Sequence, residues 1–232
     1  NCPAAAMVYS SNIHSYRELP LRLADFGRLH RNERSGVTHG LTRVRSFSQD
    51  DAHIFCKFDQ IESEISNFLQ MLDDSYKTFK FDNIRFELSL RPEKRVGDDN
   101  TWNESEKILK NILETNKYQY SMQSGEGAFY GPKIDAFVPD ALGREWQLGT
   151  VQLDFSLPER FDLEYIEEDG SRQKPVVIHR AMLGSLERFL GVLIEHLSGN
   201  FPTWLSPIQA IIIPIRPIIK KDPILVKSLF VV

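Results

Sequence analysis

The sequence predicts an α+β fold in which helices flank an antiparallel β-sheet, and three observations support this prediction. Segments typical of strands outnumber those typical of helices, the strand segments come in pairs that form hairpins, and few helices stand between the pairs. A doubly wound parallel sheet needs a crossover between successive strands, so this order favours the antiparallel arrangement.

The first half of the chain predicts a long hairpin, a helix and a strand. The hairpin covers residues 19–51, whose two halves alternate roughly between apolar and polar residues around the turn-rich segment NERSGVTHGLT. The helix follows because apolar residues then recur at steps of three and four and share one face. These residues are Phe58, Ile61, Ile65, Phe68, Leu69, Leu72, Tyr76 and Phe79. Residues 84–90 alternate as a half-buried strand that ends at Arg91-Pro92.

The second half predicts two further helices around a set of strands. Thr101 and Glu104 form a capping-box pattern that predicts the start of a helix, which continues through Leu113. A short strand then precedes the glycine-rich segment SGEGAFYGPK. Further strands are predicted over residues 134–138, 145–155 and 175–179, with turns at residues 139–143 and 167–170. A helix from about Leu183 to Leu197 closes the domain.

The composition is that of an ordinary soluble globular protein with one sizeable domain, since 41% of the 232 residues are hydrophobic and 26% are charged. The net charge of -4 excludes a generally basic surface, so nucleic-acid binding must use local patches. No run of about 18 apolar residues could cross a bilayer, and the start NCPAAAMV lacks the basic segment of a secretory signal. One Cys2–Cys56 bridge would add little to such a core, which favours a reduced compartment.

The division of the chain is predicted near residue 204. Residues 1–204 read as one domain, whereas the composition changes after Phe201-Pro202 and residues 205–232 are too short to complete a second unit. The chain also lacks an initiator Met. We therefore expect it to begin inside a longer natural protein.

The hairpin carries the densest candidate chemistry of the sequence. The segment HRNERSGVTHGLTRVRSFSQDDAHIF concentrates arginines, an Arg-Asn-Glu triplet, an aromatic residue and an acidic pair. An arginine fork can grip a phosphate with two hydrogen bonds, so Arg31 beside Glu33 suggests a site for a nucleoside triphosphate. A solvated hairpin with surface ion pairs is the alternative, and composition alone leaves both open.

This hairpin resembles motif 2 of the class II aminoacyl-tRNA synthetases. Further motifs make nearly all of residues 1–215 similar to the threonyl-tRNA synthetase family, in the family's order: NCP, QDDAHIFC, GEGAFYGPK, GTVQLDFSLPERF and VVIHRAMLGSLERF. The resemblance implies a class II synthetase-type antiparallel β-sheet flanked by helices. It also implies that residues 1–204 are the catalytic core, with motif 1 lying upstream, and that residues 205–232 are a linker and the incomplete start of an anticodon-binding domain.

The resemblance implies which residues bind ATP. Arg31 would bind the α-phosphate, Glu33 would read the exocyclic amine of adenine, and Phe47 would stack on the base. The segment GSLERF matches motif 3, where Arg188 would contact the γ-phosphate; Gln147 also falls in the ATP set. Arg31 and Arg188 are therefore the expected catalytic residues. Mg²⁺ would accompany ATP and bridge its phosphate oxygens.

The same resemblance implies the threonine pocket and a metal site. The threonine-binding residues would be Gln49, Asp51, Tyr130, Arg43 and Lys133, of which Arg43 would help hold either substrate phosphates or the carboxylate. Gln152 and Ser185 also fall in motif-like positions, and an ordinary packed aromatic is the alternative for Tyr130. Cys2, His53 and His179 have none of the spacing of a zinc finger or ribbon, and on their own the histidines read as core or surface residues. The family match implies that they hold one Zn²⁺ per chain, which selects threonine over valine through the hydroxyl group.

The departure from the family lies beside this cysteine. Many family members have Gly-His where this chain has Ala4-Ala5, so Cys2 is the ligand that we expect to be displaced, if any is. The other histidines, His14, His30, His39 and His196, are read as structural, and Cys56 as a buried thiol.

The function implied by the resemblance is that of a threonine–tRNA ligase, with ATP, L-threonine and tRNA(Thr) as partners, a homodimer in the full-length protein and no membrane. The expected location is the cytoplasm, with a mitochondrial or other organelle matrix as the alternative. Another class II synthetase, such as the prolyl or seryl enzyme, would share the ATP motifs but not the Cys-His-His set. A synthetase-like regulatory module without catalysis is the second alternative.

Overall fold

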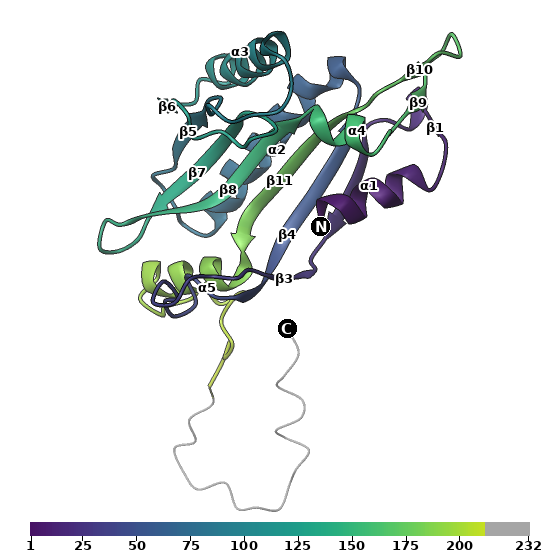
Figure 1. The fold of residues 1–232 in the computed structure, drawn as a ribbon. Coiled ribbons are helices and arrows are strands. Elements are labelled where there is room, and N and C mark those ends of the chain that lie inside the picture. Colours follow the sequence, from purple (N-terminus) through teal and green to yellow (C-terminus); the bar gives the residue numbers. More distant parts are fainter. Residues whose placement is uncertain (212–232) are drawn as a thin grey trace, which may run out of the picture.

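The predicted α+β class with an antiparallel sheet is confirmed in a computed structural model that describes residues 1–211. The central sheet has eight strands, in the order β2-β4-β11-β8-β7-β5-β6 with β3 also paired to β4 (Figure 1). Its described neighbours are antiparallel except for the pair β5 and β6. The strands are β2 Leu21–Asp25, β3 Arg28–His30, β4 Ser46–Cys56, β5 Arg85–Ser89, β6 Tyr120–Gln123, β7 Lys133–Pro139, β8 Glu145–Asp154 and β11 Val176–Ser185.

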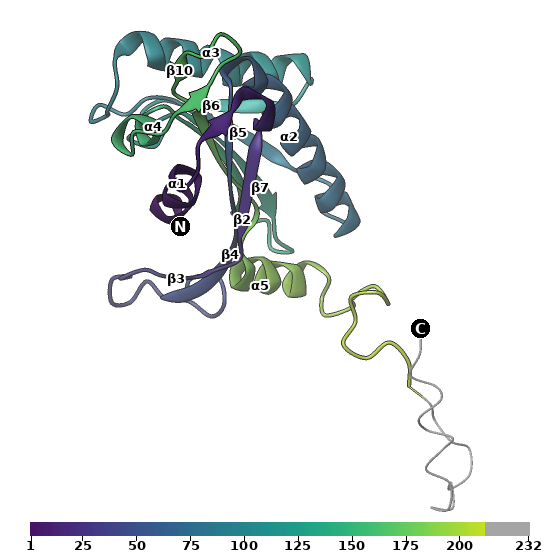
Figure 2. The same cartoon turned by 90° about the vertical axis from the view of Figure 1, so that its right-hand side faces the viewer.

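Helices cover the two faces of the sheet unequally. The long helices α2 (Ile61–Thr78) and α3 (Asp99–Thr115) pack their apolar stripes on one face and form the main core with Ile54, Ile178 and Leu153. On the other face lie the shorter α1 (Cys2–Ser10) and α4 (Ser156–Arg160), as the edge view in Figure 2 shows. This second face is therefore covered at one end only.

A small sheet and a last helix complete the described part. Strand β9 (Tyr165–Ile166) pairs with β1 (His14–Ser15) and with β10 (Arg172–Gln173). Short 3₁₀ turns cover Tyr16–Glu18 and Phe58–Gln60. Helix α5 (Leu186–His196) directly follows β11. No helix within residues 1–211 is both long and apolar enough to span a bilayer.

The register of the sheet sets which side chains share the partly covered face, because residues directly opposite each other on paired strands project to the same side. His53 on β4 lies opposite His179 on β11, which lies opposite Gln152 on β8. Gln152 lies opposite Lys133 on β7. A neighbouring row on the same face consists of Asp51, Ala181, Thr150 and Asp135.

Two predicted element boundaries were wrong. Helix α3 begins at Asp99 and not at the Thr101 capping box, because Asp98 is the N-cap: its Oδ1 accepts the N–H of Asn100 at 2.8 Å and that of Thr101 at 3.0 Å. The last helix begins at Leu186 and not at Leu183. The buried carboxylate of Asp50 explains this shift, since it accepts the N–H groups of Met182, Leu183 and Gly184 and keeps them in an irregular strand end.

Helix α1 was not predicted. Its apolar residues form one continuous run, Ala4 to Val8, so they show none of the three-and-four spacing that identifies an amphipathic helix. Helix α2 and the strands β5, β7 and β8 are confirmed within a few residues, whereas β4 continues to Cys56 and β11 to Ser185, beyond their predicted ends at residues 51 and 179. The short elements α4, β1, β9 and β10 were not predicted either. The division at residue 204 stays a prediction, and residues 212–232, part of the predicted second unit, lie outside the described residues.

Gly131, at the entry to β7, illustrates how tightly the strands approach, and Gly131→Ala should destabilise the fold by about 3 kcal/mol. A Cβ atom there would lie 1.8 Å from the carbonyl oxygen of Leu153, a backbone atom that cannot rotate away. Chemical denaturation measures the change. Gly125→Ala is the control: φ is +86° but no atom lies within 4 Å, so only about 1 kcal/mol of backbone strain is expected. Equal losses in the two variants would contradict the steric explanation.

Candidate active site

Cys2, His53 and His179, which are far apart in sequence, meet on the partly covered face of the sheet. Cys2 lies in the first turn of α1, His53 on β4 and His179 directly opposite on β11. Their ligand atoms all lie within 4.8 Å of one another, and the two imidazole rings are 4.9 Å apart at their centroids. The cluster therefore has the size of a metal site with one thiolate and two imidazoles.

The donor atoms of the two histidines fit a metal ion. Nε2 of His53 and Nδ1 of His179 are buried without a hydrogen-bond partner. Such orphaned atoms are rare in folded proteins and need an explanation. The other ring nitrogen of His179, Nε2, lies 2.9 Å from Oδ2 of Asp154, as in sites where a carboxylate orients a metal-binding histidine. The residues present thus suit the Zn²⁺ that the motifs imply.

The protein shifts the pKa values of the two imidazoles in opposite directions. Burial lowers the pKa of His53 to about 3, so this ring is neutral and its lone pair is available. Burial also disfavours the charged form of His179, but Asp154 and Cys2 outweigh it and raise the pKa of His179 to about 9. A metal ion that binds at neutral pH would therefore displace a proton from His179.

Three arginines converge at the other end of this face. Burial lowers the pKa of Arg188, and the neighbouring cations Arg43 and Arg31 lower it further. Arg188 is held by its Nε, which donates to the carbonyl oxygen of Thr42 at 2.8 Å. Guanidinium groups that repel one another in this way are poised for a polyanion such as a triphosphate.

Phe47 and Glu33 lie beside these arginines. The guanidinium of Arg31 sits over the ring of Phe47, 5.1 Å from its centroid, and Phe47 is buried. Glu33 is paired with Arg43, whose Nη2 lies 3.0 Å from its Oε2. Arg43, which the motifs place with threonine, thus contacts a residue of the predicted nucleotide set.

The residues predicted for threonine lie between the cluster and the arginines. Gln49 and Asp51 precede His53 at intervals of two along β4 and share its face, and burial raises the pKa of Asp51. The ring of Tyr130 lies 5.4 Å from that of His179, and its hydroxyl donates to Oε1 of Gln152. Tyr130 thus lies beside the metal cluster, and its role in binding threonine stays a prediction.

Lys133 and Gln147 meet at one carboxylate that the sequence did not single out. Both donate to Asp135, Lys133 through Nζ and Gln147 through Nε2 at 2.7 Å. Asp154 behind His179 was missed as well. Both acids occupy buried positions within strands, and an acidic residue inside an otherwise apolar strand is the signal that could have found them.

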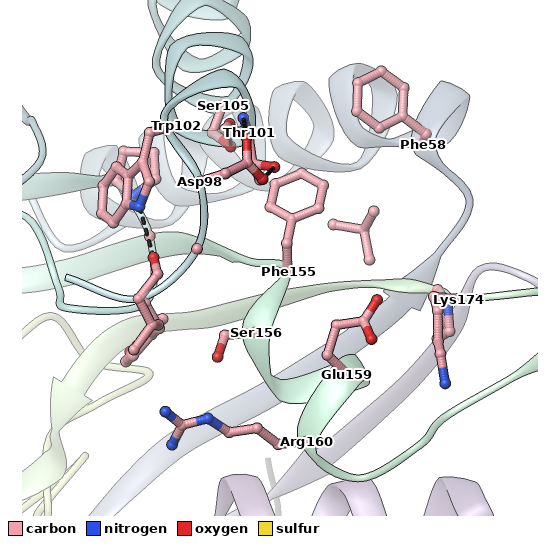
Figure 3. Close-up of a pocket in the computed structure, with 17 residues that line it drawn as sticks. Phe58, Asp98, Thr101, Trp102, Ser105, Phe155, Ser156, Glu159, Arg160 and Lys174 are labelled. Atoms are coloured by element: carbon pink, nitrogen blue, oxygen red, sulfur yellow. Dashed lines mark hydrogen bonds between the residues drawn. The ribbon is translucent and has the colours of Figure 1, made fainter.

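A cavity of about 660 Å³ lies elsewhere, between the N-terminus of α3, α4 and the segment that leads into β11 (Figure 3). Aromatic side chains line it, namely Phe58, Trp102 and Phe155, together with charged groups such as Glu159 and Arg160. Tyr130 is the one predicted site residue among those that line it. The carboxylate of Asp98 at its edge caps α3.

Comparison with known proteins assigns the chain to a family. Residues 1–197 match the family described as the tRNA synthetase class II core domain (G, H, P, S and T). The chain belongs to this class II synthetase core-domain family.

Within the class, the most similar sequences include threonine–tRNA ligases. The chain is 54% identical over 215 residues to that of Francisella tularensis subsp. tularensis (strain WY96-3418) and 55% identical to that of Methylobacillus flagellatus (strain ATCC 51484 / DSM 6875 / VKM B-1610 / KT). Each alignment covers 93% of this chain but only 34% of the relative. A solved structure of the RNA binding domain of threonyl-tRNA synthetase from Cryptosporidium parvum Iowa II is similar with a TM-score of 0.86 and 48% identity, over 89% of this chain and 52% of that one.

Proposed function

We propose that this chain is the catalytic core of a threonine–tRNA ligase, which activates L-threonine with ATP to threonyl-adenylate and transfers it to tRNA(Thr). The observation that carries the proposal is the cluster of Cys2, His53 and His179, in which two imidazole nitrogens have no hydrogen-bond partner. The arginine group, which consists of Arg31, Arg43 and Arg188, lies at the other end of the same sheet face. The similarity to threonine–tRNA ligases supports it. In the full-length protein we expect a homodimer that acts in the cytoplasm.

In this proposal the metal triad selects the amino acid. When bound, Zn²⁺ supplies a Lewis acid with coordination positions left open by one thiolate and two imidazoles. Asp51 and Tyr130 lie on the same side and can orient the polar groups of threonine. Valine has nearly the same shape but lacks the hydroxyl, so a pocket built for oxygen rejects it.

The arginines perform the work on the nucleotide. The carboxylate of threonine attacks the α-phosphorus of ATP, pyrophosphate leaves, and Arg31, Arg43 and Arg188 meet the charge that develops on the phosphates. Mg²⁺ bound with ATP would supply further positive charge. The attacking group belongs to the substrate. The protein therefore needs no side-chain nucleophile, and its contribution is positioning and charge neutralisation.

Amino-acid-dependent ATP–pyrophosphate exchange by the intact gene product tests the proposal. We expect exchange with threonine at least 100-fold above that with valine, a ratio of the size that one lost polar contact produces. We also expect about one zinc ion per chain by metal analysis. Exchange with proline or serine that ignores threonine would identify a different class II synthetase, and no exchange with any amino acid would favour the regulatory module.

A further inference from the structure

Asp135 on β7 is a buried carboxylate at the centre of the candidate site. It is 2% exposed, and three donors from two strands surround it. Oδ1 accepts from Gln147 Nε2 and from Thr150 Oγ1, each at 2.7 Å, and Oδ2 accepts from Lys133 Nζ. Burying a carboxylate costs free energy unless hydrogen bonds compensate. The three donors therefore stabilise the buried Asp135, and Asp135 in turn fixes the positions of the three donors.

The carboxylate sets the direction of a hydrogen-bond chain. An ionised carboxylate only accepts, so the single proton of the Thr150 hydroxyl must point to Asp135. Thr150 Oγ1 then accepts from Gln152, whose Nε2 lies 3.2 Å away. The amide of Gln152 is thereby oriented.

The last member of the chain is Tyr130. Because Gln152 directs its Nε2 to Thr150, its Oε1 faces Tyr130 and accepts the hydroxyl proton. The lone pairs of the Tyr130 oxygen stay free to accept from a donor, beside the ring of His179. With the opposite direction along the chain, the hydroxyl would donate outward and repel such a group.

We infer that Asp135 is a positioning residue that makes the Tyr130 hydroxyl an acceptor for the amino group of threonine and at the same time holds Lys133 and Gln147. The inference rests on the proposed function. It connects the two substrates, since Lys133 belongs to the predicted threonine set and Gln147 to the ATP set. The reaction joins these substrates, and a small displacement of reacting groups slows such a step strongly.

Asp135→Asn in the intact gene product tests the inference. The new amide has one acceptor oxygen in place of two, so its NH2 group faces either Thr150 and Gln147 or Lys133, and a donor loses its acceptor in both orientations. In the first orientation the NH2 group donates to Thr150, which reverses the chain and turns the Tyr130 hydroxyl toward the substrate as a donor. We expect KM for threonine to rise at least about tenfold and kcat/KM to fall about a hundredfold. Asp135→Glu keeps an acceptor-only carboxylate and should recover part of the loss. A wild-type KM for threonine in Asp135→Asn would overturn the inference.

Asp140→Asn is the matched control. Asp140 is equally buried, at 5% exposure, at the far end of the same β7–β8 hairpin, and it accepts from Leu142 N, Arg144 N, Arg144 Nε and Trp146 Nε1. Its replacement should lower the thermal midpoint and leave KM for threonine unchanged. If both variants lost activity only in proportion to their folded fraction, the role of Asp135 would be structural and the inference wrong.

Thr150→Val decides the question where Asp135→Asn does not fold. It keeps the shape of the side chain, removes the hydroxyl of the chain, and leaves the contacts of Asp135 with Lys133 and Gln147 in place. We expect a higher KM for threonine and an unchanged KM for ATP; an unchanged KM for threonine would overturn the inference. If the wild type showed no threonine-dependent exchange, the proposed function would be wrong. Calorimetry would then measure threonine binding to the wild type, and absence of binding would overturn the inference as well.

Discussion

Replacement of Arg188 by alanine is expected to reduce threonine-dependent ATP–pyrophosphate exchange by about a thousandfold, the scale of removing an arginine that stabilises phosphate charge. Arg188 is half buried beside Arg31 and Arg43, where burial and the two cations lower its pKa. Its side chain also donates to the carbonyl oxygens of Thr42 and Gln147, which ties the hairpin loop to β8. Steady-state exchange rates at saturating threonine and ATP measure the effect.

Two further variants separate charge from geometry. Arg188→Lys keeps the charge but loses the planar fork, so an intermediate rate is expected. Arg180→Ala is the control, because Arg180 is also half buried with a pKa lowered by burial, but lies over Phe68 on the core face. It should lower the thermal midpoint and preserve the rate per folded molecule. Full exchange activity in Arg188→Ala would remove this residue from the reaction.

Replacement of His53 by alanine is expected to remove the bound zinc and the discrimination between threonine and valine together. His53 supplies one of two buried imidazole nitrogens without a protein partner, and its lone pair is free because burial lowers its pKa to about 3. Two ligands hold zinc far more weakly than three. Metal analysis after gel filtration should give less than about a tenth of the wild-type zinc, and exchange with threonine should fall at least about a hundredfold.

His14→Ala provides the matched control. His14 is also buried, and its Nε2 lies 2.9 Å from the carbonyl oxygen of Tyr9. Each of the two substitutions therefore removes one buried imidazole ring, but only His53 belongs to the metal cluster. We expect this variant to lose stability but to keep its zinc and its specificity. Retention of a full zinc complement in His53→Ala would exclude His53 as a ligand.

Much of the fold could be predicted from local patterns. The spacing of apolar residues identified α2, and alternation identified the strands, because both depend on neighbours along the chain. The start of the last helix was mispredicted because a side chain distant in the sequence intervenes. Asp50 on β4 holds the end of β11 away from a helical conformation, and no pattern within residues 182–186 records that contact.

The candidate site followed a similar division. Motif resemblance named the members of the metal cluster and of the arginine group, and their roles as binding residues stay predictions until the variants are measured. It did not name Asp135 or Asp154, which touch the predicted residues from behind. These two residues act through hydrogen bonds to side chains on neighbouring strands, and a sequence pattern does not show which side chains on different strands are bonded to each other.

The sequence by itself determined the types and order of most elements and the kinds of residue available for chemistry. The tertiary structure decided which of them meet: His53 opposite His179, Lys133 opposite Gln152, and Cys2 brought to both by a helix that no periodicity announced. The physical reason is strand register, which is set by packing and hydrogen bonds across the whole sheet. A shift of one residue would turn every one of these side chains to the other face, although the local pattern of each strand would remain the same.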